Sequence, residues 1–247
     1  MKISVCIPMY NESSVIEATA RTLSAYMEAH FADYEILFCD DGSKDGSADI
    51  VRALGLKNVI VTGYPQNQGK GCAVRTAMLE ATGDYVMFTD ADLAYGTDVI
   101  ERTVRTFEEH PEAALVIGSR NLNSDGYEGY TAMRRLASKV YIRMLCLIGG
   151  FKLTDSQCGC KAFEGRAAKE IFSRCSVNGF AFDFEALLWA DALGMTIKEM
   201  PVKVINHRES KIRLVSDAFK MMRDLLKMKK RIKRTVRAES KLAEKKK

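Results

Sequence analysis

The chain has 247 residues, of which 47% are hydrophobic and 28% charged, as in an ordinary soluble globular protein. This composition excludes an intrinsically disordered chain, a collagen-like chain and a coiled-coil rod. Residues 1–4 run directly into an apolar segment, so we expect no signal peptide, and no apolar segment reaches the roughly 20 residues of a membrane-spanning helix. We therefore expect no membrane-spanning segment. The seven cysteines lack the spacing of a disulfide framework, and we expect them to be reduced thiols.

The net charge of +5 hides an uneven distribution along the chain. Residues 211–247 hold 15 Lys and Arg against 4 Asp and Glu, which gives this tail a net charge of +11, whereas residues 1–210 carry −6. A basic tail favours a phosphate-bearing partner, either an anionic lipid surface or a nucleic acid. Apolar residues at helical spacing within the tail favour the lipid surface, and we expect no nucleic acid partner.

Short apolar runs alternate with segments of helical periodicity in the first half of the chain. Strands are expected at residues 3–10, 34–39, 59–62, 85–89 and 114–119, and helices at 13–29, from 47, at 69–81 and at 97–109. Ser13 or Ser14 is the expected N-cap of the first helix. The alternation predicts an α/β fold, with a mostly parallel sheet covered by helices on both faces. Functional residues of such sheets collect in loops at the carboxyl ends of the strands.

The pattern changes after residue 120. We expect a helix at 131–148, a polar segment at 154–161, a short helix, a helix ending near 193, a strand near 196–204 and a helix at 214–236. The helix at 131–148 carries a basic stripe, Arg135, Lys139 and Arg143, and an apolar face, Met133, Leu136, Val140, Met144 and Leu147. An amphipathic helix of this kind either lies on an anionic membrane surface or packs on the body of the protein. For 131–148 both alternatives stay open, and for the basic tail the membrane surface is favoured.

Asp90 and Asp92 come directly after an apolar strand. Two carboxylates at this spacing can project into one crevice, where their hard oxygen atoms suit Mg²⁺ or Mn²⁺ together with phosphate oxygens of a substrate. The alternative is an acidic turn that caps the following helix. The metal site is the favoured interpretation.

Two further loops carry weaker signals. Asp40-Asp41-Gly42-Ser43 is typical of a turn, although its carboxylates lie at the end of a neighbouring strand. Gly69-Lys70-Gly71 lacks the spacing of a P-loop, so a phosphate at the N-terminus of the following helix and simple loop-to-helix punctuation are equally compatible with it.

Several segments together resemble the family 2 glycosyltransferases of the GT-A fold, in particular the branch of dolichyl-phosphate β-glucosyltransferases and other polyprenyl-phosphate glycosyltransferases. The segments are residues 7–12, 40–47, 67–75, 90–92, 118–120, 155–161 and 181–185, and their order and spacing match from about residue 3 to residue 211. Two features depart from the branch. Its members often carry a membrane-spanning helix at one end, and Cys160 stands where an aromatic residue is usual.

The resemblance implies a role for each matching residue. The nucleotide-sugar is expected to contact Pro8, Tyr10, Glu12, Asp41, Lys70 and Asp90. The metal ion, Mg²⁺ or Mn²⁺, is expected at Asp90 and Asp92. The acceptor phosphate is expected near Arg120, Arg134, Arg135, Gln157 and Arg208, with Lys211 beside them. Either Asp155 or Asp183 is the expected catalytic base, and the sequence does not separate the two.

The implied reaction is an inverting transfer of a hexose, glucose from UDP-glucose, to a polyprenyl or dolichyl phosphate at the cytoplasmic surface of a membrane. Residues 1–210 would form the catalytic domain, with a nucleotide-sugar half at 1–120 and an acceptor half at 121–210, and residues 211–247 a basic helical tail. A saccharide or protein acceptor is the alternative within the family. A phosphotransferase with Asp90 as nucleophile and a non-catalytic binding module are the alternatives outside it.

Overall fold

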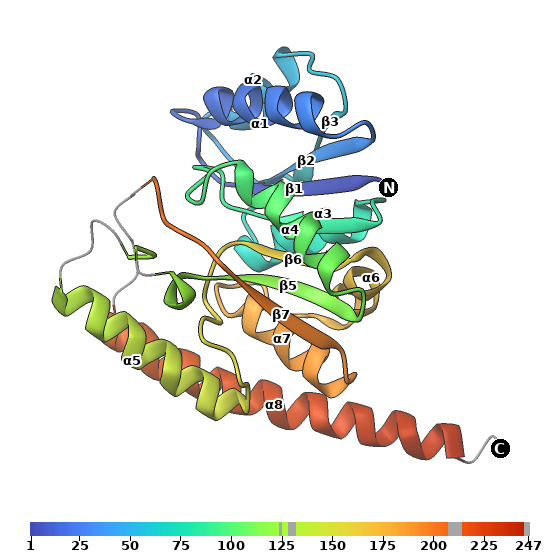
Figure 1. Ribbon diagram of the computed structural model, residues 1–247, viewed down its shortest axis with the longest axis vertical. Helices are drawn as coiled ribbons and strands as arrows, with labels where there is room; N and C mark the ends of the chain where they lie inside the picture. The colour runs from blue at the N-terminus through green and yellow to red at the C-terminus, as the bar shows by residue number, and fades with distance from the viewer. Residues whose placement is uncertain (124, 128–131, 207–213, 245–247) are drawn as a thin grey trace.

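The computed structural model describes residues 1–123, 125–127, 132–206 and 214–244. Within these ranges, the side chains of residues 132, 134, 137, 214–224, 240 and 242–244 are not described. The described residues form one sheet with helices on both of its faces (Figure 1).

The sheet has seven strands in the described part of the chain, in the order β3-β2-β1-β4-β6-β5-β7. The strands are β1 (Ile3–Met9), β2 (Tyr34–Asp41), β3 (Val59–Tyr64), β4 (Tyr85–Phe88), β5 (Ala113–Ser119), β6 (Lys161–Glu164) and β7 (Thr196–Pro201). All neighbouring strands are parallel except at β6, which runs antiparallel to β4 and β5. The expected mostly parallel α/β sheet is confirmed, whereas β6 lies at the end of the segment expected to be polar.

The helices are α1 (Ile16–His30), α2 (Ser47–Ala53), α3 (Lys70–Glu80), α4 (Asp98–Glu109), α5 (Ala132–Gly149), α6 (Gly165–Arg174), α7 (Phe182–Ala192) and α8 (Leu214–Glu244), with a 3₁₀ turn at Arg120–Leu122. The expected cap of α1 is wrong. Val15 occupies the N-cap position without a side-chain hydrogen bond, and the Ser13 amide instead donates to Asp45 at 2.9 Å. The loop before α1 is thus fastened to the loop before α2.

Side chains alternate between the two faces of the sheet, as the pleat requires. On one face, Ile3, Val5 and Ile7 of β1 pack in a core shared with α1, α2 and α4. On the other face, Cys6 of β1 and Phe88 of β4 belong to a core shared with α3, α5, α6, α7 and α8. All seven cysteines are free and buried, as expected for reduced thiols.

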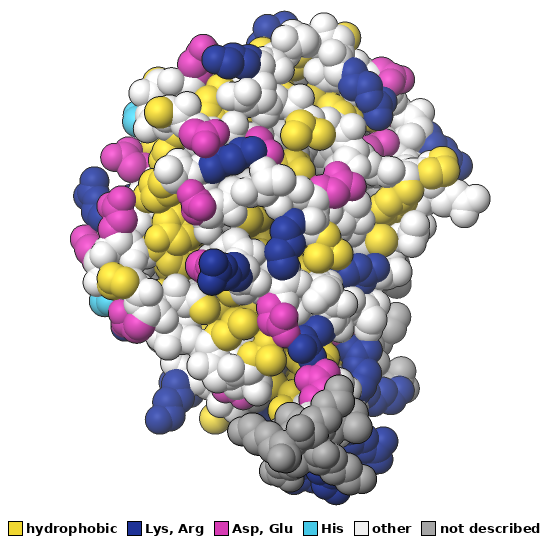
Figure 2. All heavy atoms as spheres, turned by 90° about the vertical axis from the view of Figure 1, so that its right-hand side faces the viewer, with side chains coloured by type: hydrophobic (Ala, Val, Ile, Leu, Met, Phe, Trp, Pro, Cys, Tyr) yellow, Lys and Arg dark blue, Asp and Glu magenta, His cyan; other side chains and the backbone are white. Residues whose placement is uncertain are grey.

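The carboxyl ends of β1, β2, β4 and β5 meet at one edge of the sheet. Because β6 is antiparallel, its first residue lies at that same edge, where Lys161 is in register with Phe88 of β4 and Ile117 of β5. Figure 2 shows the face at the opposite ends of the strands, where Lys and Arg intermingle with Asp and Glu over the upper part. The candidate site residues therefore gather at the edge that Figure 2 does not display.

The helices α5 and α8 lie side by side (Figure 1), but they use their apolar residues differently. On α8, Leu225 and Ile232 are buried against the body, so in this part of the tail the apolar face packs on the protein. On α5, the side chains of Leu136 and Leu147 are 62% and 73% exposed. No helix among the described residues is both long enough and apolar enough to cross a membrane.

Candidate active site

Asp90 follows the last residues of β4 and forms an ion pair with Lys70, the first residue of α3. The two side chains are 30% and 28% exposed, so this pair faces solvent in part. Burial lowers the pKa of the Lys70 ammonium, but Asp90, followed by Asp183 and Asp92, outweighs this effect and raises it overall. Lys70 thus remains charged beside the carboxylates.

The backbone around the two aspartates is held in a specific shape. Leu93 adopts a left-handed conformation with φ of 49°, and the Ala94 amide donates to the Asp92 carboxylate at 3.1 Å. The Asn206 side chain donates to the Asp92 carbonyl at 2.8 Å. A Cβ on Gly159 would lie 2.5 Å from Oδ2 of Asp90, so any residue other than glycine at position 159 would displace this carboxylate.

Asp41 lies at the end of β2 and is 3% exposed. Its carboxylate accepts hydrogen bonds from the Gln68 and Gly69 amides, at 2.8 and 2.9 Å, and from the Asn67 side chain at 2.8 Å. In this structure Asp41 therefore fixes the loop before α3. Its direct contact with a nucleotide stays a prediction.

The segment after β1 carries the other residues expected on the nucleotide side. Pro8 is buried within β1, whereas Tyr10 is 44% exposed. The Glu12 amide donates to Ser47 at 2.8 Å, and Asn11 adopts a positive φ of 53°. These contacts leave the exposed Tyr10 ring at the edge where the strands end.

The N-terminus of α3 is covered by another loop. The Gly71 amide donates to the Asn178 carbonyl at 2.7 Å, and the Cys72 amide donates to Gly69 at 2.9 Å. A Cβ on Gly71 would approach the Val177 carbonyl to 2.5 Å. The Gly69-Lys70-Gly71 segment therefore marks a close contact between loop and helix that engages the Gly71 and Cys72 amides, and a phosphate at this helix N-terminus stays a prediction.

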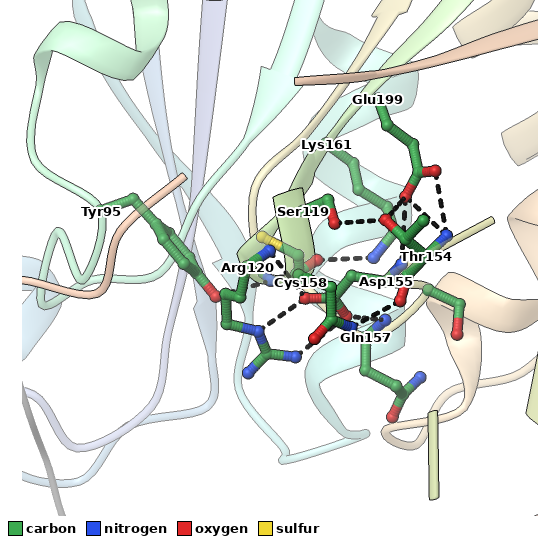
Figure 3. Close-up of polar contacts among 12 residues, drawn as sticks. Tyr95, Ser119, Arg120, Thr154, Asp155, Gln157, Cys158, Lys161 and Glu199 are labelled. Atoms are coloured by element: carbon green, nitrogen blue, oxygen red, sulfur yellow. Dashed lines mark hydrogen bonds and ion pairs between the residues drawn. The ribbon is translucent and has the colours of Figure 1, made fainter. Parts of the chain in front are cut away.

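Asp155 is fully buried and bound by Arg120 (Figure 3). Arg120 donates from Nε to Oδ2 at 2.7 Å, from Nη2 to Oδ1 at 3.0 Å and from its own amide to Oδ2 at 3.1 Å. Burial lowers the pKa of Arg120, but Asp155 overrides it and raises this pKa well above its ordinary value. A carboxylate with both oxygens engaged and no access to solvent is unsuited to take a proton from a substrate. The structure thus argues against Asp155 as the base.

Asp183 lies in the first turn of α7, and its side chain keeps 11% of its exposure. Its Oδ2 lies 3.2 Å from Nζ of Lys161, and its Oδ1 accepts from the Phe184 amide at 2.8 Å. The Gln157 side chain donates to it at 3.3 Å. Asp183 is therefore held by three partners but, unlike Asp155, is not fully enclosed, so it is the better candidate of the two for the base.

Only part of the expected acceptor side is described. Arg120 is committed to Asp155, and Gln157 contacts Asp183, while Arg135 is exposed on α5. The side chain of Arg134 and the residues Arg208 and Lys211 lie outside the part of the chain that the structure describes. The acceptor contacts expected of these residues stay predictions.

Three site-forming residues were not expected from the sequence. Lys161 is fully buried beside Asp183, and Tyr95 accepts from the Gly159 amide at 3.1 Å. Glu185, also fully buried, accepts from the Ser176 and Val177 amides and pairs with Arg231 of α8. A charged residue inside an apolar segment, as in Lys161-Ala-Phe or Phe-Glu185-Ala, is the signal that would have found two of them.

Comparison with known proteins agrees with this arrangement. Residues 4–172 match the model of glycosyl transferase family 2. The chain belongs to this family. It is 32% identical over 236 residues to a dolichyl-phosphate beta-glucosyltransferase of Trichomonas vaginalis, covering 92% of this chain and 72% of the relative. It is 29% identical over 243 residues to the dolichyl-phosphate beta-glucosyltransferase of Saccharomyces cerevisiae, covering 91% and 73%. This protein is thus a glycosyltransferase.

Solved structures show the same fold. Glucosyl-3-phosphoglycerate synthase of Mycobacterium tuberculosis, in complex with uridine diphosphate, superimposes with a TM-score of 0.68 at 21% identity, covering 94% of this chain and 79% of that one. Mannosyl-3-phosphoglycerate synthase of Rubrobacter xylanophilus gives a TM-score of 0.65 at 20% identity, covering 98% and 75%. The GT-A fold expected for the family is confirmed.

Proposed function

We propose that this glycosyltransferase moves glucose from UDP-glucose to a polyprenyl or dolichyl phosphate, with inversion at the anomeric carbon. One observation carries the proposal. A chain that aligns over 92% of its length with a dolichyl-phosphate beta-glucosyltransferase brings Lys70, Asp90 and Asp183 together at one edge of its sheet. The donor diphosphate would lie toward Lys70 and Asp90, and the acceptor phosphate toward Asp183.

The carboxylates Asp90 and Asp92 suit a divalent metal ion. They offer hard oxygen ligands, and Gly159 leaves room at Oδ2 of Asp90 that a larger residue would fill. The described residues contain no group of three or more metal-ligating side chains, so phosphate oxygens and water would complete the shell. A bound Mg²⁺ or Mn²⁺ would neutralise charge that develops on the leaving diphosphate.

Lys70 would act on the same side of the reaction. Its ammonium sits at Asp90 with a raised pKa, so it stays protonated at neutral pH. A fixed cation here attracts the donor diphosphate and stabilises the charge on the leaving UDP. Asp41 would support this by holding the 67–69 loop from which α3 begins.

On the acceptor side, an oxygen of the lipid phosphate forms a bond to the anomeric carbon of glucose. The bond from that carbon to the diphosphate oxygen breaks, and its electron pair leaves with UDP. A phosphomonoester still carries one proton in part near neutral pH, and the negative charge of Asp183 favours this form beside it, so Asp183 takes that proton as the bond to carbon forms. Because the nucleophile enters opposite the leaving group, the configuration inverts, and catalysis is largely a matter of positioning.

The lipid acceptor requires that the enzyme reach a membrane surface, and the exposed stripe on α5 suits this task. Met133, Leu136, Val140 and Leu147 are 78%, 62%, 60% and 73% exposed. Arg135, Lys139 and Arg143 are exposed on the same helix. Apolar insertion flanked by cations is the pattern of an interfacial helix on anionic lipid. We place this surface at the cytoplasmic face, where the seven free cysteines fit a reducing compartment.

Vesicle binding tests this surface. Leu136→Glu is expected to weaken binding to vesicles of phosphatidylcholine and phosphatidylserine roughly 10-fold, since it removes one inserted leucine. Leu79→Glu changes an exposed leucine, 38%, on α3, a helix that is not assigned to lipid, and serves as the control. Equal losses in both variants would contradict the assignment to α5.

The chain divides by role in this proposal. Residues 1–120 would serve the nucleotide-sugar, residues 121–210 the acceptor, and the basic segment 211–247 the attachment to the body and to lipid. Family membership removes the support for the phosphotransferase and for the non-catalytic module. A saccharide or a protein is the alternative acceptor, and the experiment must distinguish it from the lipid phosphate.

The proposal is tested by UDP release from UDP-glucose with Mg²⁺ or Mn²⁺, with and without undecaprenyl or dolichyl phosphate in detergent. We expect release that depends on the lipid and stops when a chelator removes the metal. Asp92→Asn should abolish turnover while circular dichroism shows an intact fold. Full activity of that variant would contradict the metal site, and release only with another acceptor would contradict the lipid.

A further inference from the structure

Lys161 is a buried cation at the edge of the sheet where the candidate site lies. It begins β6, in register with Phe88 of β4 and Ile117 of β5, and its side chain is fully buried. Nζ lies 5.9 Å from the centre of the Phe88 ring. A buried ammonium is strongly disfavoured unless it is paired and hydrogen-bonded, so the partners of Lys161 define its role.

Those partners belong to two different segments. Nζ donates to the Cys158 carbonyl at 2.6 Å, and it lies 3.2 Å from Oδ2 of Asp183 on α7. The first contact holds the turn that precedes β6. The contact with Asp183 fixes Oδ2 and compensates the charge of the carboxylate from the protein interior. The Phe184 amide holds the other oxygen, Oδ1.

The turn that Lys161 holds reaches the donor side of the site. Gly159, the residue after Cys158, lies against Oδ2 of Asp90 and donates its amide to Tyr95 at 3.1 Å. Lys161 thus connects the carboxylate expected to act on the acceptor with the turn beside the carboxylate expected to act on the donor. Among the lysine side chains that the structure describes, no other is fully buried.

We propose that Lys161 is a positioning residue for glycosyl transfer. From the protein interior, it orients the Asp183 carboxylate toward the acceptor phosphate. This inference rests on the proposed function. Lys161 does not touch a substrate, because its side chain is enclosed by the protein. Its contribution passes through Asp183, so it should disappear when the Asp183 charge is absent.

A double-mutant cycle tests this dependence. Lys161→Met, a neutral residue of similar length, should lower kcat by about 100-fold, the loss expected when a general base is misplaced. In the Asp183→Asn background the same change should lower kcat by no more than about 3-fold, because coupled residues do not contribute additively. Lys161→Arg keeps a cation at the position and should recover most of the lost turnover.

Two controls separate positioning from folding. Thermal unfolding is recorded for every variant, and Lys2→Met serves as the matched control, because it breaks the Lys2–Glu35 pair remote from this edge of the sheet. Its effect on kcat should be small and the same in both backgrounds. The KM for UDP-glucose should stay within about 2-fold in the Lys161 variants, since Tyr95 still holds the Gly159 amide in the turn beside Asp90.

The outcomes are distinguishable. An equal loss from Lys161→Met in both backgrounds, or a loss confined to donor KM, would overturn the positioning role while leaving the proposed function intact. If Lys161→Met does not fold, the Lys161→Arg variant still decides. A folded Arg variant without recovered turnover would overturn the proposal. Wild-type enzyme without lipid-dependent transfer would overturn the proposed function itself, and this inference with it.

Discussion

Two ion pairs near the start of β6 place opposite partners in the interior. In the Arg120–Asp155 pair the carboxylate is fully buried and the arginine side chain is 11% exposed, whereas in the Lys161–Asp183 pair the lysine is fully buried and the carboxylate 11% exposed. Asp155 gives both oxygens to one guanidinium, whereas the oxygens of Asp183 bind Lys161, Gln157 and the Phe184 amide. The fully buried member of each pair supports the structure, and the partly exposed Asp183 is the carboxylate that can meet a substrate. Which partner of an ion pair is fully buried therefore distinguishes a carboxylate that supports the structure from one that can act on a substrate.

The largest expected effect comes from breaking the Arg120–Asp155 pair, in which both carboxylate oxygens bind one guanidinium. Asp155→Asn leaves the Arg120 guanidinium buried without its counter-charge, which should lower the free energy of unfolding by about 3–5 kcal/mol. Urea denaturation followed by circular dichroism measures this. Unchanged stability together with lost turnover would contradict the comparison and restore Asp155 as a candidate base.

The second largest effect is expected from replacing Asp183, the partly exposed carboxylate. Asp183→Asn keeps the size of the side chain and removes its charge, so kcat should fall about 100-fold, equivalent to about 2.7 kcal/mol of transition-state stabilisation. Stability should fall as well, because the fully buried Lys161 ammonium loses its counter-charge and keeps the Cys158 carbonyl as its acceptor. Steady-state kinetics and denaturation on the same preparation compare the two pairs directly. Turnover at the wild-type level would exclude Asp183 as the base.

A third pair, Lys70–Asp90, is more exposed than either, at 28% and 30%. Lys70→Met should raise the KM for UDP-glucose about 10-fold, as expected for one charge-assisted contact to a diphosphate. Burial lowers the Lys70 pKa, but Asp90 and its neighbours raise it above the ordinary value of 10.5, so wild-type donor binding should not weaken between pH 7 and 9 through loss of this charge. Loss of donor affinity across that range in wild type but not in the Met variant would contradict the assignment.

The smallest effect is expected from Lys2–Glu35, a structural pair away from the site. Burial raises the pKa of Glu35, but hydrogen bonds from Ser4, Thr82 and Lys2 lower it overall from its ordinary value of 4.5. A lowered folded pKa means that the stabilisation is complete above pH 4.5 and is lost as the pH falls through the folded value. Glu35→Gln should cost about 1–2 kcal/mol at pH 7 and progressively less in acid. A pH-independent difference between variant and wild type would contradict this account.

The strands on the donor side of the site could be predicted from the sequence, because short-range patterns specify them. The strands expected at 3–10, 34–39 and 85–89 match β1, β2 and β4 within a few residues, since each is an apolar run followed by polar turn residues. Parallel strands place Asp41 and Asp90 at the same edge without further information.

The acceptor side of the site was harder to predict from the sequence, because contacts between distant segments determine its structure. The strand β6 has only four residues and begins with a lysine, so neither length nor hydrophobicity marks it. Asp155 and Asp183 look alike in sequence, and only the partners Arg120 and Lys161 distinguish them. Likewise, α5 and α8 both show amphipathic spacing, but only the folded structure shows that Leu225 is covered while Leu136 is exposed.

The most direct test of the proposed function is the identity of the product. Wild-type enzyme is incubated with UDP-glucose, a divalent metal and polyprenyl phosphate in detergent, and the lipid fraction is analysed by mass spectrometry and NMR. The account predicts one lipid-phosphate-linked glucose in the β configuration for each UDP released. UDP release without a lipid-linked sugar, or a product with the α configuration, would contradict it.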